Sequence, residues 1–420
     1  MNRERLRHWL VMAVLGLSGG TIFLLPFLQE IYYNPLLDAL QINNTQLGSL
    51  LSIFGVSSML SYLPGGWLAD RVSPRKLMTL SLLLTGGLGF YFATFPSLTA
   101  SRVIHACWGV SITLLFWSSM IRATRNWAPP DQQGKAFGLL ESGRGVAEVA
   151  VASALLAGFG LWGASGQALS TVIMLLSAVT CALGLLSWWV IEDDPGARSL
   201  TGAAWADVKR VLAMPVVWCI AIVVLAGYSA YWGTFRFTPY ATDMFALSVT
   251  LAGVISVGKG YLKPVGALLA GLVADRVGIA RTVCLLFLVL VISFAAFAFL
   301  PGVPSALPVM LLGVAIVSLA TYALRGIYFA LLEEGGVPMA MTGIATGLVS
   351  VVGFTPDIFM PLLGGMLLDA HPGALGYRYF FLATAGICVL GLLAALTILR
   401  RLKRSKGVSG AHGPPPETEA

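Results

Sequence analysis

The chain has 420 residues, of which 57% are hydrophobic and 11% are charged, against roughly 25% charged in an average soluble domain. So little charge could not cover the surface of a water-soluble fold of this length, and the composition therefore indicates a membrane protein. The formal net charge of +7 does not indicate a nucleic-acid partner, because the basic residues form no basic face interleaved with stacking aromatic side chains.

Long apolar runs follow one another along the chain. A transmembrane helix needs about 20 apolar residues to cross roughly 30 Å of hydrocarbon, and turn signals separate twelve runs of about that length. They predict an all-α membrane protein with twelve transmembrane helices. The predicted spans are residues 9–31, 45–69, 77–95, 101–121, 137–161, 169–191, 215–237, 249–273, 282–301, 306–332, 340–367 and 378–399.

The basic residues between these runs predict the orientation. Lys and Arg concentrate in cytoplasmic connections, and here they occupy alternate connections and follow the last span, whereas the other side has little more than Arg378. Both termini are therefore expected in the cytoplasm, in a multi-pass protein of the plasma membrane. The first apolar run is too long for the core of a cleavable signal peptide, and none is expected.

One short motif occurs twice and divides the chain into similar halves. Residues 66–72 (GWLADRV) return 205 positions later as residues 271–277 (GLVADRV). A repeat of this length in an apolar chain indicates two membrane halves with internal symmetry. We expect a six-helix bundle at 1–191, a cytoplasmic linker with a short interfacial helix at 192–214, a second six-helix bundle at 215–400 related by a pseudo-two-fold axis, and a disordered cytoplasmic tail at 401–420.

The motif also carries a family resemblance. Residues 66–76 (GWLADRVSPRK), together with twelve spans in a six-plus-six repeat, resemble the major facilitator superfamily of secondary transporters. The resemblance implies a latch that holds the two halves together in the outward-open state. A plainer interpretation is that the basic turn serves membrane topology alone. The residues assigned to the latch are Gly66, Asp70, Arg71, Arg75, Gly271, Asp275 and Arg276.

Placing an ionisable residue inside a transmembrane span costs free energy. Each costs about 2.5–3.5 kcal/mol on insertion scales, so such residues usually face a cavity or pair with one another. The span at 137–161 carries Glu141, Arg144 and Glu148, whose spacing places all three on one face of a helix. They predict either a static ion network or a cavity in which Arg144 is a substrate anchor or an internal counterion and the glutamates carry protons, with Glu148 the better carrier.

The span at 249–273 carries two lysines one helical turn apart. Lys259 and Lys263 repel each other at that spacing, so we expect a negative partner nearby, either a carboxylate from the other half or a bound anion. The glycines around them and Pro264 predict a bent or loosened helix, the usual way in which a span exposes groups to substrate. Tyr261, between the lysines, is expected to line the same cavity.

Four further ionisable residues complete the predicted site. Arg236 and Arg325 add cations, while Glu30 and Asp357 add acids, although Glu30 could equally lie at the outer interface. The expected substrate-binding residues are therefore Arg144, Arg236, Lys259, Tyr261, Lys263 and Arg325. The expected proton-coupling residues are Glu30, Glu141, Glu148 and Asp357.

Enzymatic chemistry is not expected. The five cysteines all lie in apolar runs without metal-ligand or disulfide spacing, and the sequence has no Walker-type nucleotide loop. With no nucleophile–base pair or metal constellation, we expect neither an enzyme nor a bound cofactor. A sensor that signals to a partner would need a substantial cytoplasmic domain, which the short connections do not provide.

These features favour a secondary active transporter of a small organic anion, either a sugar acid or a phosphorylated metabolite. It would work by alternating access in the lipid bilayer, coupled to protons and as a monomer. The organic-anion branches of the superfamily resemble this chain in having cations within the membrane. The alternative is a proton-driven exporter of an amphipathic drug-like compound or lysolipid, although the Gly-Pro motif that drug antiporters usually carry is absent from residues 150–160.

Overall fold

The computed structural model describes residues 3–69, 71–129, 132–193, 205–338 and 341–410, and every regular element within them is helical. Eight helical segments in this part of the chain are long and apolar enough to cross a membrane. The other four predicted spans are also helices, but charged or small polar residues interrupt their apolar runs. They are α1 (Arg3–Thr21), α3 (Asn44–Ala69), α4 (Pro74–Phe92) and the consecutive pair α12 (Val249–Gly260) and α13 (Leu262–Val277). The predicted twelve-helix arrangement is therefore present.

The first bundle contains the helices up to α8. Besides α1, α3 and α4, its elements are η1 (Leu28–Glu30), α2 (Tyr33–Leu40), α5 (Leu98–Val110), the π-helix η2 (Ser111–Trp117), α6 (Ser118–Trp127), α7 (Gln133–Leu161) and α8 (Gly166–Val190). The connection to the second bundle includes the short helix α9 (Trp205–Leu212), which confirms the helix predicted in the linker.

The second bundle contains the remaining helices. Besides α12 and α13, its elements are α10 (Pro215–Gly233), η4 (Thr234–Arg236), α11 (Phe237–Phe245), α14 (Ile279–Phe299), η5 (Pro304–Ala306), α15 (Leu307–Ile327), η6 (Tyr328–Ala330), α16 (Leu331–Glu334), α17 (Thr342–Gly353), α18 (Pro356–Ala370) and α19 (Ala374–Gly410). Helix α19 extends beyond the bundle and continues through 401–410, part of the segment expected to be disordered. Arginine and lysine are good helix formers and favour a helix C-terminus, which explains the extension.

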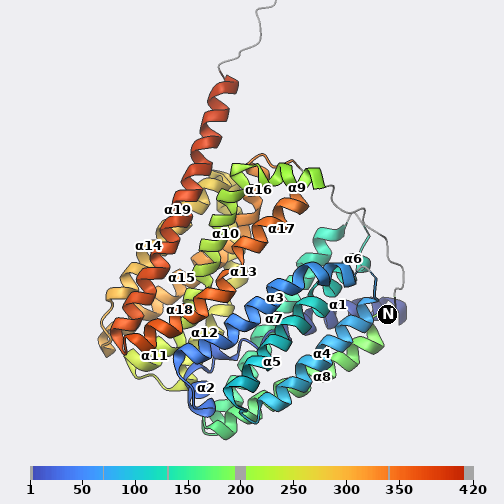
Figure 1. Cartoon of the computed structure of the whole chain (residues 1–420), viewed down its shortest axis with the longest axis vertical. Coiled ribbons are helices and arrows are strands. Elements are labelled where there is room, and N and C mark those ends of the chain that lie inside the picture. The colour runs from blue at the N-terminus through green and yellow to red at the C-terminus, as the bar shows by residue number, and fades with distance from the viewer. Residues whose placement is uncertain (1–2, 70, 130–131, 194–204, 339–340, 411–420) are drawn as a thin grey trace, which may run out of the picture.

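The two bundles converge at one end and diverge at the other (Figure 1). We call the end that carries α2 and α11 the closed end, and the end that carries α6 and α9 the basic end. Two helix pairs form most of the interface: α3 packs against α18, and α7 packs against α12. Glycines allow the approach on α3, since a Cβ at Gly48 would meet the backbone of Pro361 and a Cβ at Gly55 would meet that of Asp357.

The predicted break in the span at 249–273 is confirmed. Helix α12 ends at Gly260 and α13 begins at Leu262, with Tyr261 between them. Pro264 has no N–H to donate to the carbonyl group of Gly260, and this missing bond accounts for the position of the break. The two parts have different neighbours, because α12 contacts α7 of the other bundle whereas α13 packs on α15 of its own.

Candidate functional site

Lys259 forms an ion pair that joins the two bundles. Its Nζ lies 2.8 Å from Oε1 of Glu30 in the first bundle, and the lysine side chain is only 1% exposed. The same Nζ donates to the carbonyl oxygen of Thr234 at 3.0 Å and to the Thr234 hydroxyl at 3.1 Å. Glu30 therefore lies at the interface between the bundles.

Lys263 forms a second pair between the bundles, one helical turn further along. Its Nζ donates to Oε1 of Glu148 on α7, and the two side chains are 28% and 36% exposed. Each lysine therefore has a carboxylate from the other half, one of the two partners expected from the sequence. The second pair is the more accessible to solvent, and so it is better placed to open when a ligand arrives.

Arg144 is bound within its own bundle. Its Nη1 lies 2.6 Å from Oε1 of Glu141, its Nε donates to the carbonyl oxygen of Gly19 at 3.3 Å, and its guanidinium lies 5.1 Å from the ring centroid of Trp117. Trp117 ends the π-helix η2, whose extra residue per turn changes the direction of the side chains that follow. The Glu141 side chain is 62% exposed and the Arg144 side chain 18% exposed, so the pair is open on the side of the glutamate.

Arg325 is held by aromatic rings. Its guanidinium lies 4.1 Å from the ring centroid of Tyr231 and 5.4 Å from that of Tyr228. Tyr231 is 6.4 Å from Tyr322, and the Lys263 Nζ lies 5.8 Å from the Tyr322 ring. These side chains therefore form a continuous row in the order Lys263, Tyr322, Tyr231, Arg325, with a cation at each end and two tyrosine rings between them.

Two of these tyrosines were missed by the sequence prediction. Tyr322 lies three residues before Arg325, which was predicted, and Tyr228 lies three residues before Tyr231, so the members of each pair share a helix face. That spacing is the signal that could have identified them. Tyr261, which was predicted, is exposed between the bundles, and its hydroxyl lies 3.4 Å from Ser153 Oγ on α7.

Asp357 differs from the other predicted acids in its partner. Its Oδ1 accepts a hydrogen bond from Trp232 Nε1 at 2.9 Å. Among the described residues, no ion pair is found for it, whereas Glu30, Glu141 and Glu148 each have one. Asp357 lies at the first turn of α18, directly against Gly55 of α3 in the other bundle.

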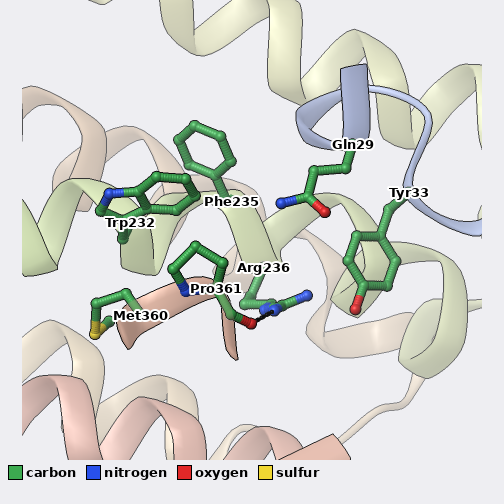
Figure 2. Close-up of a pocket in the computed structure, with 7 residues that line it drawn as sticks. All are labelled: Gln29, Tyr33, Trp232, Phe235, Arg236, Met360 and Pro361. Atoms are coloured by element: carbon green, nitrogen blue, oxygen red, sulfur yellow. Dashed lines mark hydrogen bonds between the residues drawn. The ribbon is translucent and has the colours of Figure 1, made fainter. Parts of the chain in front are cut away.

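Arg236 lies apart from these groups, toward the closed end. It is 4% exposed; its Nη2 donates to the carbonyl oxygen of Pro361 at 3.0 Å, and its guanidinium lies 4.9 Å from the ring centroid of Tyr33. Figure 2 shows Gln29 and Tyr33 of the first bundle facing it across a cavity of about 10 Å³, room for about one water molecule. The predicted substrate residues therefore fall into separate places, with Arg236 enclosed and Lys263 and Arg325 more accessible.

The predicted latch residues that the structure describes lie at the basic end. Arg71 stacks 4.2 Å from the ring of Trp67 and Arg75 stacks 4.1 Å from the ring of Trp188, both in their own bundle. Asp275 and Arg276 are exposed. A Cβ at Gly66 or Gly271 would have no neighbour within 4 Å among the described atoms. Asp70 lies outside the described residues, and the latch stays a prediction.

A family model described as Major Facilitator Superfamily matches residues 9–356. The chain belongs to the major facilitator superfamily. It is therefore a multi-pass membrane transporter and not an enzyme. The chain resembles the inner membrane protein YihN of Escherichia coli, with 28% identity over 95% of this chain and 97% of the relative.

Other relatives in the superfamily carry more specific names. A putative sugar efflux transporter of Deinococcus radiodurans is 26% identical, over 94% of this chain and 98% of the relative. Probable anion transporter 6 of Oryza sativa is 27% identical, over 43% of this chain and 41% of the relative. A solved bacterial homologue of the lysosomal transporter Spinster has a TM-score of 0.76 at 16% identity and covers 94% of this chain and 98% of its own, a likeness that shows the fold.

Proposed function

We propose that the protein is a proton-coupled transporter of a small organic anion that works by alternating access in the cytoplasmic membrane, with both termini in the cytoplasm. The anion is a sugar acid or a phosphorylated metabolite. The convergence of the bundles at the closed end and their divergence at the basic end support a cargo path that faces the cytoplasm in this conformation (Figure 1). The relatives named as anion and sugar transporters agree with this class of cargo.

The observation that carries the proposal is the row of two cations and two tyrosine rings between Lys263 and Arg325. Arg325 has no ion pair with a carboxylate among the described residues; its partners are neutral tyrosine side chains, which an anionic ligand could replace as the stronger acceptor. A planar guanidinium binds carboxylate or phosphate through two parallel hydrogen bonds. Lys263 adds a second cation, and the tyrosine rings between them suit the face of a sugar.

Proton coupling is proposed to use Asp357. Asp357 forms no ion pair among the described residues, so a proton bound there would leave no lysine without its partner, whereas a proton on Glu30 or Glu148 would break an ion pair between the bundles. Asp357 also touches the other bundle through Gly55, so its surroundings change when the bundles separate. Glu30 and Glu148 would instead release their lysines as the interface opens, and Glu141 would stay paired with Arg144.

Transport of labelled glucuronate and glucose 6-phosphate into proteoliposomes tests the cargo class. Replacing Arg325 by Gln removes a charge-assisted pair of hydrogen bonds worth about 1.5–3 kcal/mol, so the apparent affinity should fall at least tenfold. Arg378→Gln is the matched control, because Arg378 lies on α19 and donates to the Ala298 carbonyl oxygen, away from the row. Equal uptake by wild type and Arg325→Gln would remove Arg325 from the site.

The proton role is tested separately with Asp357→Asn. This variant should still exchange labelled for unlabelled anion, because exchange needs no net proton movement. It should lose accumulation driven by a pH gradient, while Asp38→Asn, a change at an exposed acid on α2, should keep both. Accumulation retained in Asp357→Asn would assign the proton to another acid, with Glu148 tested next.

The exposed carboxylate of Glu141 favours a second function, export of an amphipathic cation. A transporter of this kind would carry a hydrophobic cation such as ethidium and lose that activity in Glu141→Gln. It would show no anion uptake in the first experiment. The two functions therefore give opposite results on the same purified protein.

A further inference from the structure

The last turn of α18 carries a carboxylate that lies against the first turn of α3 in the other bundle. Asp369 Oδ1 accepts hydrogen bonds from the backbone N–H of Asn44 at 3.1 Å and from its side-chain Nδ2 at 2.8 Å. Asp369 Oδ2 accepts from the backbone N–H of Thr45 at 2.7 Å and from the Thr45 hydroxyl. Both carboxylate oxygens are therefore used, and every donor belongs to the opposite bundle.

These contacts complete the cap of helix α3. The first N–H groups of a helix have no partner within the helix, and a side-chain oxygen usually satisfies them. The chain supplies half of the cap locally, because Asn43 Oδ1 accepts from the Gln46 N–H at 2.8 Å and the Gln46 side chain accepts from the Asn43 N–H at 3.0 Å. The N–H groups of the two residues between them are satisfied by Asp369.

The surrounding contacts fix the geometry of this cap. Tyr33 Oη donates to Asn44 Oδ1 at 2.8 Å, which orients the amide so that its Nδ2 faces Asp369. A Cβ at Gly365, one turn before Asp369, would collide with the backbone of Asn44, so no larger residue fits there. Two further hydrogen bonds between the bundles accompany this cap: Asn34 Nδ2 donates to Asp243 Oδ1 at 2.8 Å, and Thr238 Oγ1 donates to the Glu30 carbonyl oxygen at 2.8 Å.

We propose that Asp369 is a latch of the closed end: its carboxylate caps α3 across the bundle interface, and the bundles can separate at this end only when that cap is released. A carboxylate at a helix N-terminus is favourable because of the helix dipole as well as the hydrogen bonds. Opening exposes two uncapped N–H groups of α3 and returns the carboxylate to water, which biases the protein toward the conformation described here.

The position of Asp369 gives α3 a carboxylate at each end. Helices α3 and α18 run antiparallel, since Gly48 faces Pro361 and Gly55 faces Asp357. Asp369 caps the first turn of α3, and in the sequence Asp70 follows Ala69, the last residue of that helix. If the predicted latch at Asp70 acts in the opposite conformation, only one of the two ends is held at a time. The proposal for Asp369 does not depend on the cargo.

The distance across the closed end tests the latch without any substrate. Spin labels are placed at Gln41 and Ala374, which are exposed at this end in different bundles, in a background with the five cysteines replaced by serine. In Asp369→Ala, a second population with a longer distance between the two labels should appear. The ratio of open to closed molecules should rise at least fivefold. Asp38→Ala, which removes an exposed acid at the same end, should leave the distribution unchanged.

Asn43→Ala separates a latch from a purely structural cap. It removes the local half of the cap on the same helix turn, so it should lower the melting temperature while the distances stay as in the wild type. Thr45→Val removes one donor and should shift the distances in the same direction as Asp369→Ala but less, which keeps the test decisive if Asp369→Ala does not fold. Unchanged distances in Asp369→Ala and Thr45→Val, or an equal shift in Asn43→Ala, would overturn the proposal.

Discussion

At the scale of single residues, the cations between the bundles differ in how deeply they are buried. The Lys259 side chain is 1% exposed and that of Lys263 is 28% exposed, although both lysines pair with a glutamate of the other bundle. Leaving a buried charge without its partner costs about 3–5 kcal/mol, whereas an exposed ion pair contributes about 1 kcal/mol or less. The two pairs should therefore respond differently to the same substitution.

Glu30→Gln is expected to lower the thermal stability of the purified protein strongly, since Lys259 is left charged and enclosed. Glu148→Gln should change it little, because water reaches Lys263. The double variant Glu30→Gln/Lys259→Met should recover most of the loss, as replacing a buried pair by apolar groups is often neutral. Thermal unfolding in detergent measures all three, and equal losses in the two single variants would show that burial does not decide the effect.

The ionisable residues could be predicted one by one from the sequence, but most of their partners could not. An acid or a base in an apolar run stands out locally, which is how Glu148, Lys259 and Lys263 were found. Their pairing depends on which helices face each other, and Lys263 is 115 positions from Glu148. Asp369 was missed for a related reason, because its partners Asn44 and Thr45 lie more than 300 positions away and look like ordinary loop and helix-start residues.

At the scale of elements, close packing of α1 on α7 depends on glycine. A Cβ at Gly20 would collide with the carbonyl oxygen of Arg144 and lie 2.9 Å from the Cβ of Ala147. A Cβ at Gly16 would lie 3.1 Å from the Cα of Gly143. These contacts bring the backbone of α1 against the turn of α7 that carries Arg144, so they fix the position of that side chain.

Two glycine-to-alanine substitutions should have opposite effects. Gly20→Ala should destabilise the protein by about 1–3 kcal/mol, since a methyl group is forced into a filled space. Gly87→Ala on α4 should be neutral or stabilise by up to about 1 kcal/mol, because no described atom lies within 4 Å of the new Cβ and alanine favours a helix. Unfolding midpoints in detergent provide the comparison, and a loss in Gly87→Ala as large as in Gly20→Ala would contradict it.

The helices themselves were largely predictable, and their irregularities only in part. Length and hydropathy located all twelve spans, and the break at Tyr261 followed from Pro264 and its neighbouring glycines. The π-helix at Ser111–Trp117 was not predicted, because its residues are as apolar as those of a regular span and carry no proline or glycine. Its position is set by packing, with Ser111 hydrogen-bonded to Ser81 of α4.

At the scale of the whole molecule, the basic residues define one end. The turn between α3 and α4, the helices α6 and α9, and the extended end of α19 all carry arginine or lysine at the basic end, away from α2 and α11. Such an uneven distribution of basic residues sets the orientation of a protein during membrane insertion. It supports the proposed orientation, in which the diverging ends of the bundles face the cytoplasm.

Reporter fusions in a bacterial host test this orientation. Green fluorescent protein fused after residue 420 should fluoresce, because it folds in the cytoplasm. Alkaline phosphatase should be active when fused after Pro301, between α14 and α15, and inactive when fused at the carboxyl end, since it needs the oxidising side of the membrane. The reverse pattern of the two phosphatase fusions would invert the orientation and place the closed end inside the cell.

The break at Tyr261 divides one membrane-crossing segment between a neighbour in each bundle. Helix α12 packs on α7 of the first bundle and α13 packs on α15 of the second, so under the proposed alternating access the angle at Tyr261 would change as the bundles move. A small molecule wedged beside its exposed ring would freeze that angle. Such a compound would arrest the transporter by holding the two bundles in a single arrangement.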